Sequence, residues 1–141
     1  MGQIRQADIA RELGISEMSV HRLRKAMHIG DQALSDQACV MILTAAELQH
    51  AGLVTNRACE LVSRFSSEVR YAAGDNSRRA WLVFIEGTKR DVIVPTLTGR
   101  HLEAVLDVHP MSIVLALHEF VARASERLAA MKAILARKEA A

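Results

Sequence analysis

The sequence predicts an α+β protein in which four N-terminal helices are followed by a small antiparallel sheet and a long C-terminal helix. Apolar residues recur at helical spacing up to about residue 73. Two runs rich in β-branched and aromatic residues follow between residues 80 and 97. From residue 114 to 135, apolar residues alternate at spacings of three and four. We therefore divide the chain into a domain of residues 1–73 and a second of residues 74–141.

The composition is typical of a soluble globular protein. Of the 141 residues, 50% are hydrophobic and 24% are charged, and the net charge is +2. The N-terminus has no apolar core of a signal peptide, and no apolar run reaches the ~18 residues that span a membrane. Both cysteines, Cys39 and Cys59, lie inside apolar helical patterns. We expect a cytoplasmic protein with reduced thiols.

Two short amphipathic helices are expected between residues 7 and 27, joined by a turn that contains Gly14. Gly14 can end the first helix in the left-handed conformation, and Ser16 can cap the second. The apolar residues of the two helices share one face of each: Ile9, Ala10 and Leu13, then Val20, Leu23 and Met27. Two short helices joined in this way form a helix-turn-helix.

The outward face of the second helix carries hydrogen-bond donors around one apolar side chain. At 100° per residue, Met18, Arg22 and Lys25 face away from Val20. Such a face suits a helix in the major groove of double-stranded DNA, where arginine reads guanine edges. The alternative is an ordinary surface helix with solvated charges. We predict a DNA-binding surface on recognition helix 17–27 and its cap, made of Ser16, Glu17, Met18, Ser19, His21, Arg22 and Lys25.

Two further helices are expected after a short break at residues 28–34. Residues 36–51 are apolar around most of the circumference, which predicts a helix buried on several sides, capped by Ser35 and ended by Gly52. Residues 55–73 show an amphipathic pattern that ends at Gly74.

The first half of the chain resembles the MerR-type winged helix-turn-helix over about residues 3–70. After the helix-turn-helix, the family pattern is carried by Leu34, Ser35, Asp36, Leu48, Gly52 and Leu53, with a further helix over residues 57–65. The segment at the place of the wing is short, residues 28–34, and contains no Arg or Tyr. The helix-turn-helix alone also resembles the LacI headpiece. The resemblance implies a DNA-binding transcriptional regulator that dimerises through a C-terminal helix.

A small antiparallel sheet is expected in the second half. Residues 80–86 and 91–97 predict two strands, with a hairpin connection at residues 87–90. Pro95 places the second strand at an edge. Residues 102–108 fit a strand or a short helix, and we favour a strand because they lie between Gly99 and Pro110.

The last helix is expected to start near Ser112 and to carry a coiled-coil seam. At about 25 residues it would be nearly 40 Å long, more than its own domain needs. We therefore predict a homodimer, and the alternative is that the stripe packs on the chain's own sheet. The predicted dimerisation residues are Leu117, Val121, Ala124, Leu128, Met131 and Leu135.

No pattern of catalysis or metal binding is present in the sequence. A Gly-rich phosphate loop, CxxC, HExxH and a nucleophile elbow are all missing. The six histidines have no ligand spacing, and we expect them at the surface or in caps: His21, His28, His50, His101, His109 and His118. We predict neither an enzyme nor a cofactor, and we expect no catalytic or metal-binding residues.

These observations predict a homodimeric, sequence-specific DNA-binding transcriptional regulator of the bacterial or phage type. Two alternatives remain at this point. One is a DNA-binding factor of phages or mobile elements, similar to an excisionase or a small terminase. The other is a protein-interaction module that keeps the helix-turn-helix as a scaffold.

Overall fold

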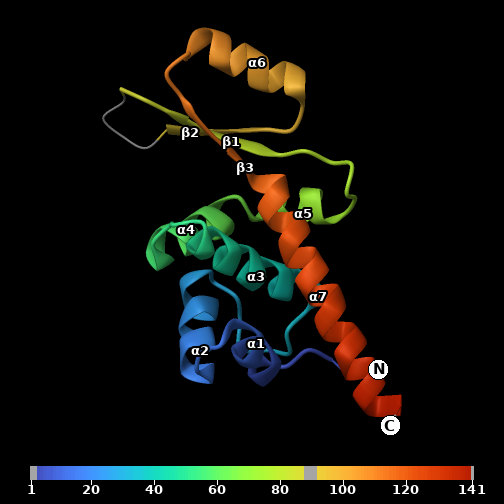
Figure 1. Ribbon diagram of the computed structural model, residues 1–141. Coiled ribbons are helices and arrows are strands. Elements are labelled where there is room, and N and C mark those ends of the chain that lie inside the picture. Colours follow the sequence, from blue (N-terminus) through green and yellow to red (C-terminus); the bar gives the residue numbers. More distant parts are fainter. Residues whose placement is uncertain (1–2, 88–91, 141) are drawn as a thin grey trace. The chain divides into compact units, whose positions relative to one another are not determined.

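A computed structural model describes residues 3–87 and 92–140, and it shows an α+β fold (Figure 1). These residues form seven helices and three strands: α1 Gln6–Leu13, α2 Glu17–Ala26, α3 Asp36–His50, α4 Thr55–Arg64, α5 Ser66–Ala73, β1 Trp81–Ile85, β2 Val92–Thr96, α6 Gly99–Val108, β3 Ile113–Ala116 and α7 Leu117–Ala140. None of these helices is both long enough and apolar enough to cross a membrane.

The chain divides into two compact units whose boundaries differ from the predicted ones. A helical unit comprises Met1–Ser66 and Arg123–Ala141, and a sheet unit comprises Ser67–Ala122. The predicted division at residue 73 therefore does not match the structure. Two helices account for the difference. α5 falls almost entirely in the sheet unit, and α7 begins in the sheet unit while its remainder belongs to the helical unit.

The core of the helical unit is built on α3. Seven consecutive residues of α3, Cys39–Ala45, are buried, as expected for a helix that is apolar on most sides. The side chain of Ser35 accepts a hydrogen bond from the backbone of Ala38, which confirms the predicted cap. The end of α3 is also as predicted, with Gly52 at a φ of 117°.

The single helix expected over residues 55–73 is two helices, α4 and α5. The break lies at Phe65, whose backbone angles (φ −109°, ψ 35°) are not helical. Phe65 is 5% exposed. The amphipathic pattern through Phe65 correctly identified buried residues, but it could not show that the backbone turns there.

The part of α7 that belongs to the helical unit forms ion pairs with other helices of that unit. Arg127 contacts the carboxylates of Glu12 and Glu47 at 3.1 and 2.9 Å, and Lys132 pairs with Asp36. On the same stretch of α7, Ala124 is fully buried. This part of α7 therefore packs against its own chain.

The predicted dimerisation stripe is largely buried within one chain. Exposed fractions are 0% for Leu117, 1% for Val121, 0% for Ala124, 6% for Leu128 and 6% for Met131, while Leu135 is half-buried. This corresponds to the alternative in which the stripe packs on the chain itself. The expectation of an exposed seam is corrected accordingly, because a second chain would find little of these side chains to cover.

The sheet unit holds an antiparallel sheet in the order β2-β1-β3. In the central strand β1, Leu82 and Val83 are fully buried. The predicted strands at residues 80–86 and 91–97 are confirmed, and Pro95 does lie on an edge strand. Of the predicted connection at residues 87–90, only Gly87, with a φ of 79°, is among the described residues.

Two predictions in the sheet unit are wrong. Residues 102–108 belong to helix α6, which is capped by Thr98 and has half-buried Leu102, Val105 and Leu106 on one helical face. Residues 113–116 form strand β3, so α7 begins at Leu117 rather than near Ser112. β3 is stabilised by pairing with β1, a long-range contact that a local helix pattern does not reveal.

Candidate nucleic-acid interface

The geometry of α1 and α2 is set by a tight turn of three residues, Gly14 to Ser16. Gly14 has a φ of 67°, the left-handed conformation that glycine adopts without steric cost. The amide of Ile15 then donates to the carbonyl of Ala10 at 3.0 Å, which satisfies one end of α1. The Ser16 hydroxyl accepts from the amide of Ser19 at 3.1 Å and caps α2. Both predicted end signals are confirmed.

One side of α2 is buried in the helical unit. Val20, Leu23 and Met27 are 0%, 7% and 2% exposed, and Ile9 and Ala10 of α1 are 0% and 6% exposed. These residues are the apolar faces that the spacing predicts. Their burial fixes the rotation of α2 about its axis, so the residues between them must face outward.

The seven predicted DNA-binding residues belong to α2 and its cap, Ser16. Six of them are exposed and Ser19 is half-buried: Ser16, Glu17, Met18, Ser19, His21, Arg22 and Lys25. The hydroxyls of Ser16 and Ser19 bond each other at 3.0 Å, so both are partly used in the cap. His21 lies 3.7 Å from the carboxylate of Asp31. Met18 is 59% exposed, and it is the apolar member of this surface.

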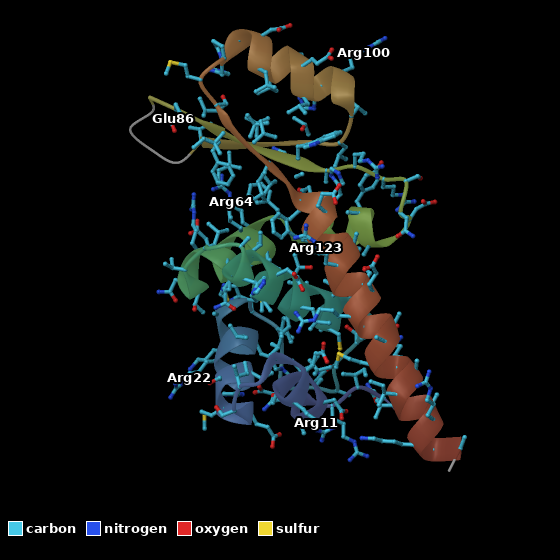
Figure 2. The ribbon with its side chains drawn as sticks, in the orientation of Figure 1. Arg11, Arg22, Arg64, Glu86, Arg100 and Arg123 are labelled. Carbon is cyan, nitrogen blue, oxygen red and sulfur yellow. The ribbon has the colours of Figure 1, made fainter. Side chains whose placement is uncertain are left out.

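Arg22 and Lys25 carry the free positive charge of the surface. Figure 2 shows the side chain of Arg22 extending from α2 away from the neighbouring helices. In the part of the chain that the structure describes, neither side chain has an ion-pair or hydrogen-bond partner. Two unpaired cations on an exposed helix face can bind phosphate or guanine without first breaking an internal contact.

Arg24 is a buried structural residue that the sequence prediction missed. It is 6% exposed, and its guanidinium donates to the side chain of Gln6 at 3.3 Å and to the carbonyls of Gln32, at 2.6 Å, and Gly30. The signal was available in the spacing. Arg24 follows Val20 by four residues and therefore lies on the inward face of α2.

Residues 28–34, at the place of the family wing, form a connection that is held to α2 by hydrogen bonds. Residues 27–35 contain no strand, and His28 adopts a left-handed φ of 59°. The amide of Ile29 donates to the carbonyl of Arg24 at 2.8 Å, and the end of the segment is anchored by Leu34, which is 4% exposed. Arg24 and Leu34 together hold this connection close to α2.

A shallow hollow beside the end of α2 adds polar groups that the sequence prediction did not include. It is lined by Ala26, His28, Asn56, Cys59, Glu60, Ser63 and Arg64. The Arg64 guanidinium lies 5.1 Å from the ring centre of Phe65, which holds its stem against the protein. No local pattern links α4 to α2, so only the fold could reveal this proximity.

The thiols and histidines do not form a reactive centre in the described residues. Burial raises the pKa of Cys39 to about 11, and it also raises the pKa of Cys59, so both thiols stay protonated at neutral pH. Among residues 3–87 and 92–140, no group of three His, Cys, Asp or Glu could hold a metal ion. His118, which was expected at the surface or in a cap, is largely buried. Its side chain is only 10% exposed, and its ring packs edge-on to the ring of Trp81.

Comparisons with known proteins returned no relative. No family model matches the chain. No curated protein and no solved structure matches it either. The functional argument therefore rests on the chain's own residues.

Proposed function

We propose that the chain is a sequence-specific, double-stranded DNA-binding protein that regulates transcription, with α1 and α2 as a helix-turn-helix. One observation carries the proposal. The side of α2 that bears Val20 and Leu23 is buried, while the opposite side presents the unpaired cations Arg22 and Lys25 with exposed Met18 between flanking polar residues. A rigid helix with this distribution fits the major groove.

Each of the three side chains has its own role in this proposal. Arg22 donates to the acceptor edge of guanine, which is the commonest specific contact in the major groove. Met18 contacts the methyl group of thymine. Lys25 lies toward the end of α2 and binds a phosphate, so it contributes affinity that does not depend on the sequence.

The MerR-like resemblance supports the same function with one modification. A family wing adds phosphate contacts beside the recognition helix, whereas residues 28–34 here form a connection without a strand. We therefore assign base recognition to α2 alone. A regulator with one such helix reads a short site, and a homodimer that reads two half-sites gains the affinity that a single contact lacks.

The experiment is selection of bound sequences from a random DNA pool, followed by titration of variants on the selected site. Arg22→Ala should weaken the selected site by about 1–3 kcal/mol and relax the preference at one base pair. Lys25→Ala should weaken all sequences alike and reduce the salt slope by about one. Arg137→Ala is the matched control, since it removes an exposed cation far along α7.

Three outcomes would contradict the proposal in different ways. If the chain binds no DNA at low salt, the helix pair is a scaffold for protein contacts. If Arg22→Ala binds the selected site as the parent does, α2 is not the reader. If the selected site lies in mobile DNA and binding leaves transcription unchanged, the protein is a DNA-positioning factor.

A further inference from the structure

The sheet has an edge strand, β3, that lacks the usual protection. β3 lies at one edge of the order β2-β1-β3, and no other strand in the described part of the chain pairs with it. Edge strands expose unpaired N–H and C=O groups, and natural proteins block them with charges, prolines or bulges. β3 reads IVLA, and its Ile113 is 60% exposed.

The opposite edge of the same sheet is protected. β2 contains Pro95, which has no N–H to offer a further strand. The sheet is therefore blocked on one edge and open on the other. We propose that β3 pairs antiparallel with β3 of a second copy of this chain, forming a continuous six-stranded sheet.

Hydrogen bonds at the start of β1 show which backbone groups of β3 face the open edge. The amide of Ala80 donates to Nδ1 of His118 at 3.2 Å, and the carbonyl of Ala80 accepts from the amide of His118 at 3.3 Å. His118 follows β3 by two residues, so both groups of Ala80 point to the side of β1 on which β3 lies. The next residue, Trp81, faces the other side, because its carbonyl accepts from the hydroxyl of Thr96 in β2 at 3.3 Å. In an antiparallel sheet the two groups of one residue share a side, and the side alternates along the strand. Leu82 and Phe84 accordingly face β3.

This alternation assigns the residues of β3 to two sides. Leu115 and Ile113 are the partners of Leu82 and Phe84, so their backbone groups are used within the chain. Val114 lies between them, and its N–H and C=O point to the open edge. By the same alternation, the groups of Ser112 and the N–H of Ala116 point there too, while the C=O of Ala116 precedes α7 and accepts the first hydrogen bond of that helix.

The same alternation fixes the register of the proposed pair. Outward groups can bond only to outward groups, and a two-fold axis requires each contact to occur twice. The pairing that uses all of residues 112–116 places Val114 opposite Val114, Ser112 opposite Ala116 and Ile113 opposite Leu115. A shift by one residue would oppose inward to outward groups, and a shift by two would shorten the overlap.

A second copy is the occupant that the chemistry of this edge favours. In a symmetric contact a charged residue would lie close to the same residue of the second copy, and the two like charges would repel. Residues 112–116 carry no charge. The pairs Ile113–Leu115 and Val114–Val114 are apolar on both sides. Val108 and Met111, in the stretch of chain that leads into β3, are also exposed, at 72% and 81%. Each copy thus supplies a surface that complements itself.

The first test compares a lysine on each edge of the sheet. Ile113 and Val92 are 60% and 42% exposed on opposite edges, so a lysine is tolerated by the fold at both sites. By analytical ultracentrifugation of the full chain at about 50 μM without DNA, we expect a dimer for the parent and for Val92→Lys. We expect Ile113→Lys to sediment as one chain of 15.5 kDa. Thermal unfolding of both variants verifies that they are folded.

The second test is a crosslink that only the proposed register allows. Two residues in a hydrogen-bonded antiparallel pair have Cα atoms about 5.5 Å apart, within the reach of a disulfide. Val114→Cys should therefore form a covalent dimer on mild oxidation, visible on a non-reducing gel, while Val92→Cys should not. The native Cys39 and Cys59 are buried and do not compete.

The proposal goes beyond DNA binding, and both measurements are made without DNA. A parent chain that is monomeric at 50 μM overturns it. So does a dimer that survives Ile113→Lys, or a folded Val114→Cys variant that stays uncrosslinked. None of these results bears on whether α2 reads DNA, so failure of the sheet pairing and failure of the proposed function are distinguishable.

Discussion

Replacement of Arg24 separates the scaffold of the candidate interface from its contact surface. Arg24→Ala removes three hydrogen bonds, to Gln6, Gly30 and Gln32, from a side chain that is 6% exposed. Gly30 and Gln32 are exposed and Gln6 is half-buried, so water can replace the lost donors, and each hydrogen bond contributes about 0.5–1.5 kcal/mol. For three such bonds we expect a loss of about 2–4 kcal/mol in the free energy of unfolding. That is a large share of the roughly 5–15 kcal/mol of a typical domain.

Urea unfolding followed by circular dichroism measures this loss, with two variants for comparison. Arg24→Lys keeps the charge but cannot fork to two carbonyls, so it should lose about half as much. Arg22→Ala lies on the same helix, is exposed, and should change the stability by less than about 0.5 kcal/mol. An Arg24→Ala variant within about 1 kcal/mol of the parent would refute the reasoning, because the clamp would then contribute no more than a surface contact.

Two further perturbations test the core. Burial raises the pKa of Cys39 from 9.0 to about 11, so the unfolded chain loses this proton first as the pH rises. The stability that this thiol contributes is complete below about pH 9 and is lost between about pH 9 and 11, with an upper limit of about 2.7 kcal/mol. Urea unfolding across this range should show a shallower decline for Cys39→Ala than for the parent, and equal slopes would refute this. Leu128→Glu places a carboxylate at a site that is 6% exposed, and it should cost about 3–5 kcal/mol of unfolding free energy without changing the mass of the folded species in ultracentrifugation. A Leu128→Glu variant that keeps its stability but changes from dimer to monomer would instead support the coiled-coil seam between two copies of α7.

The sequence predicted the ends and the buried side of α1 and α2 correctly because these signals are local. Gly14 and Ser16 mark helix ends through their own backbone and side-chain chemistry, and Val20 and Leu23 define the buried side by spacing alone. Arg24 was missed because the buried side of α2 was defined by its apolar residues alone. Its inward position was visible in the spacing, but its partners Gly30 and Gln32 belong to a connection without any periodicity.

The sheet unit was predicted less well because its elements depend on distant partners. The short apolar run of residues 102–108 fits a strand or a helix by its length and composition, and the cap by Thr98 favours the helix. Residues 113–116 continue the periodicity of α7, yet they pair with β1, about 30 residues earlier in the chain. A local pattern records which side chains share a face, and it does not reveal which surface covers that face.

The charges beside the apolar stripe on α7 indicate whether this stripe is covered by the same chain or by a second copy. In a seam between two copies of α7, flanking charges would have to be balanced by other residues of α7. Arg127 is instead neutralised by Glu12 and Glu47, and Lys132 by Asp36, all outside α7. With the apolar stripe buried and both of these cations paired inside its own chain, this face of α7 has little left to bind a second copy. A dimer must therefore use a surface that the single chain leaves incomplete, and the open edge of β3 is such a surface.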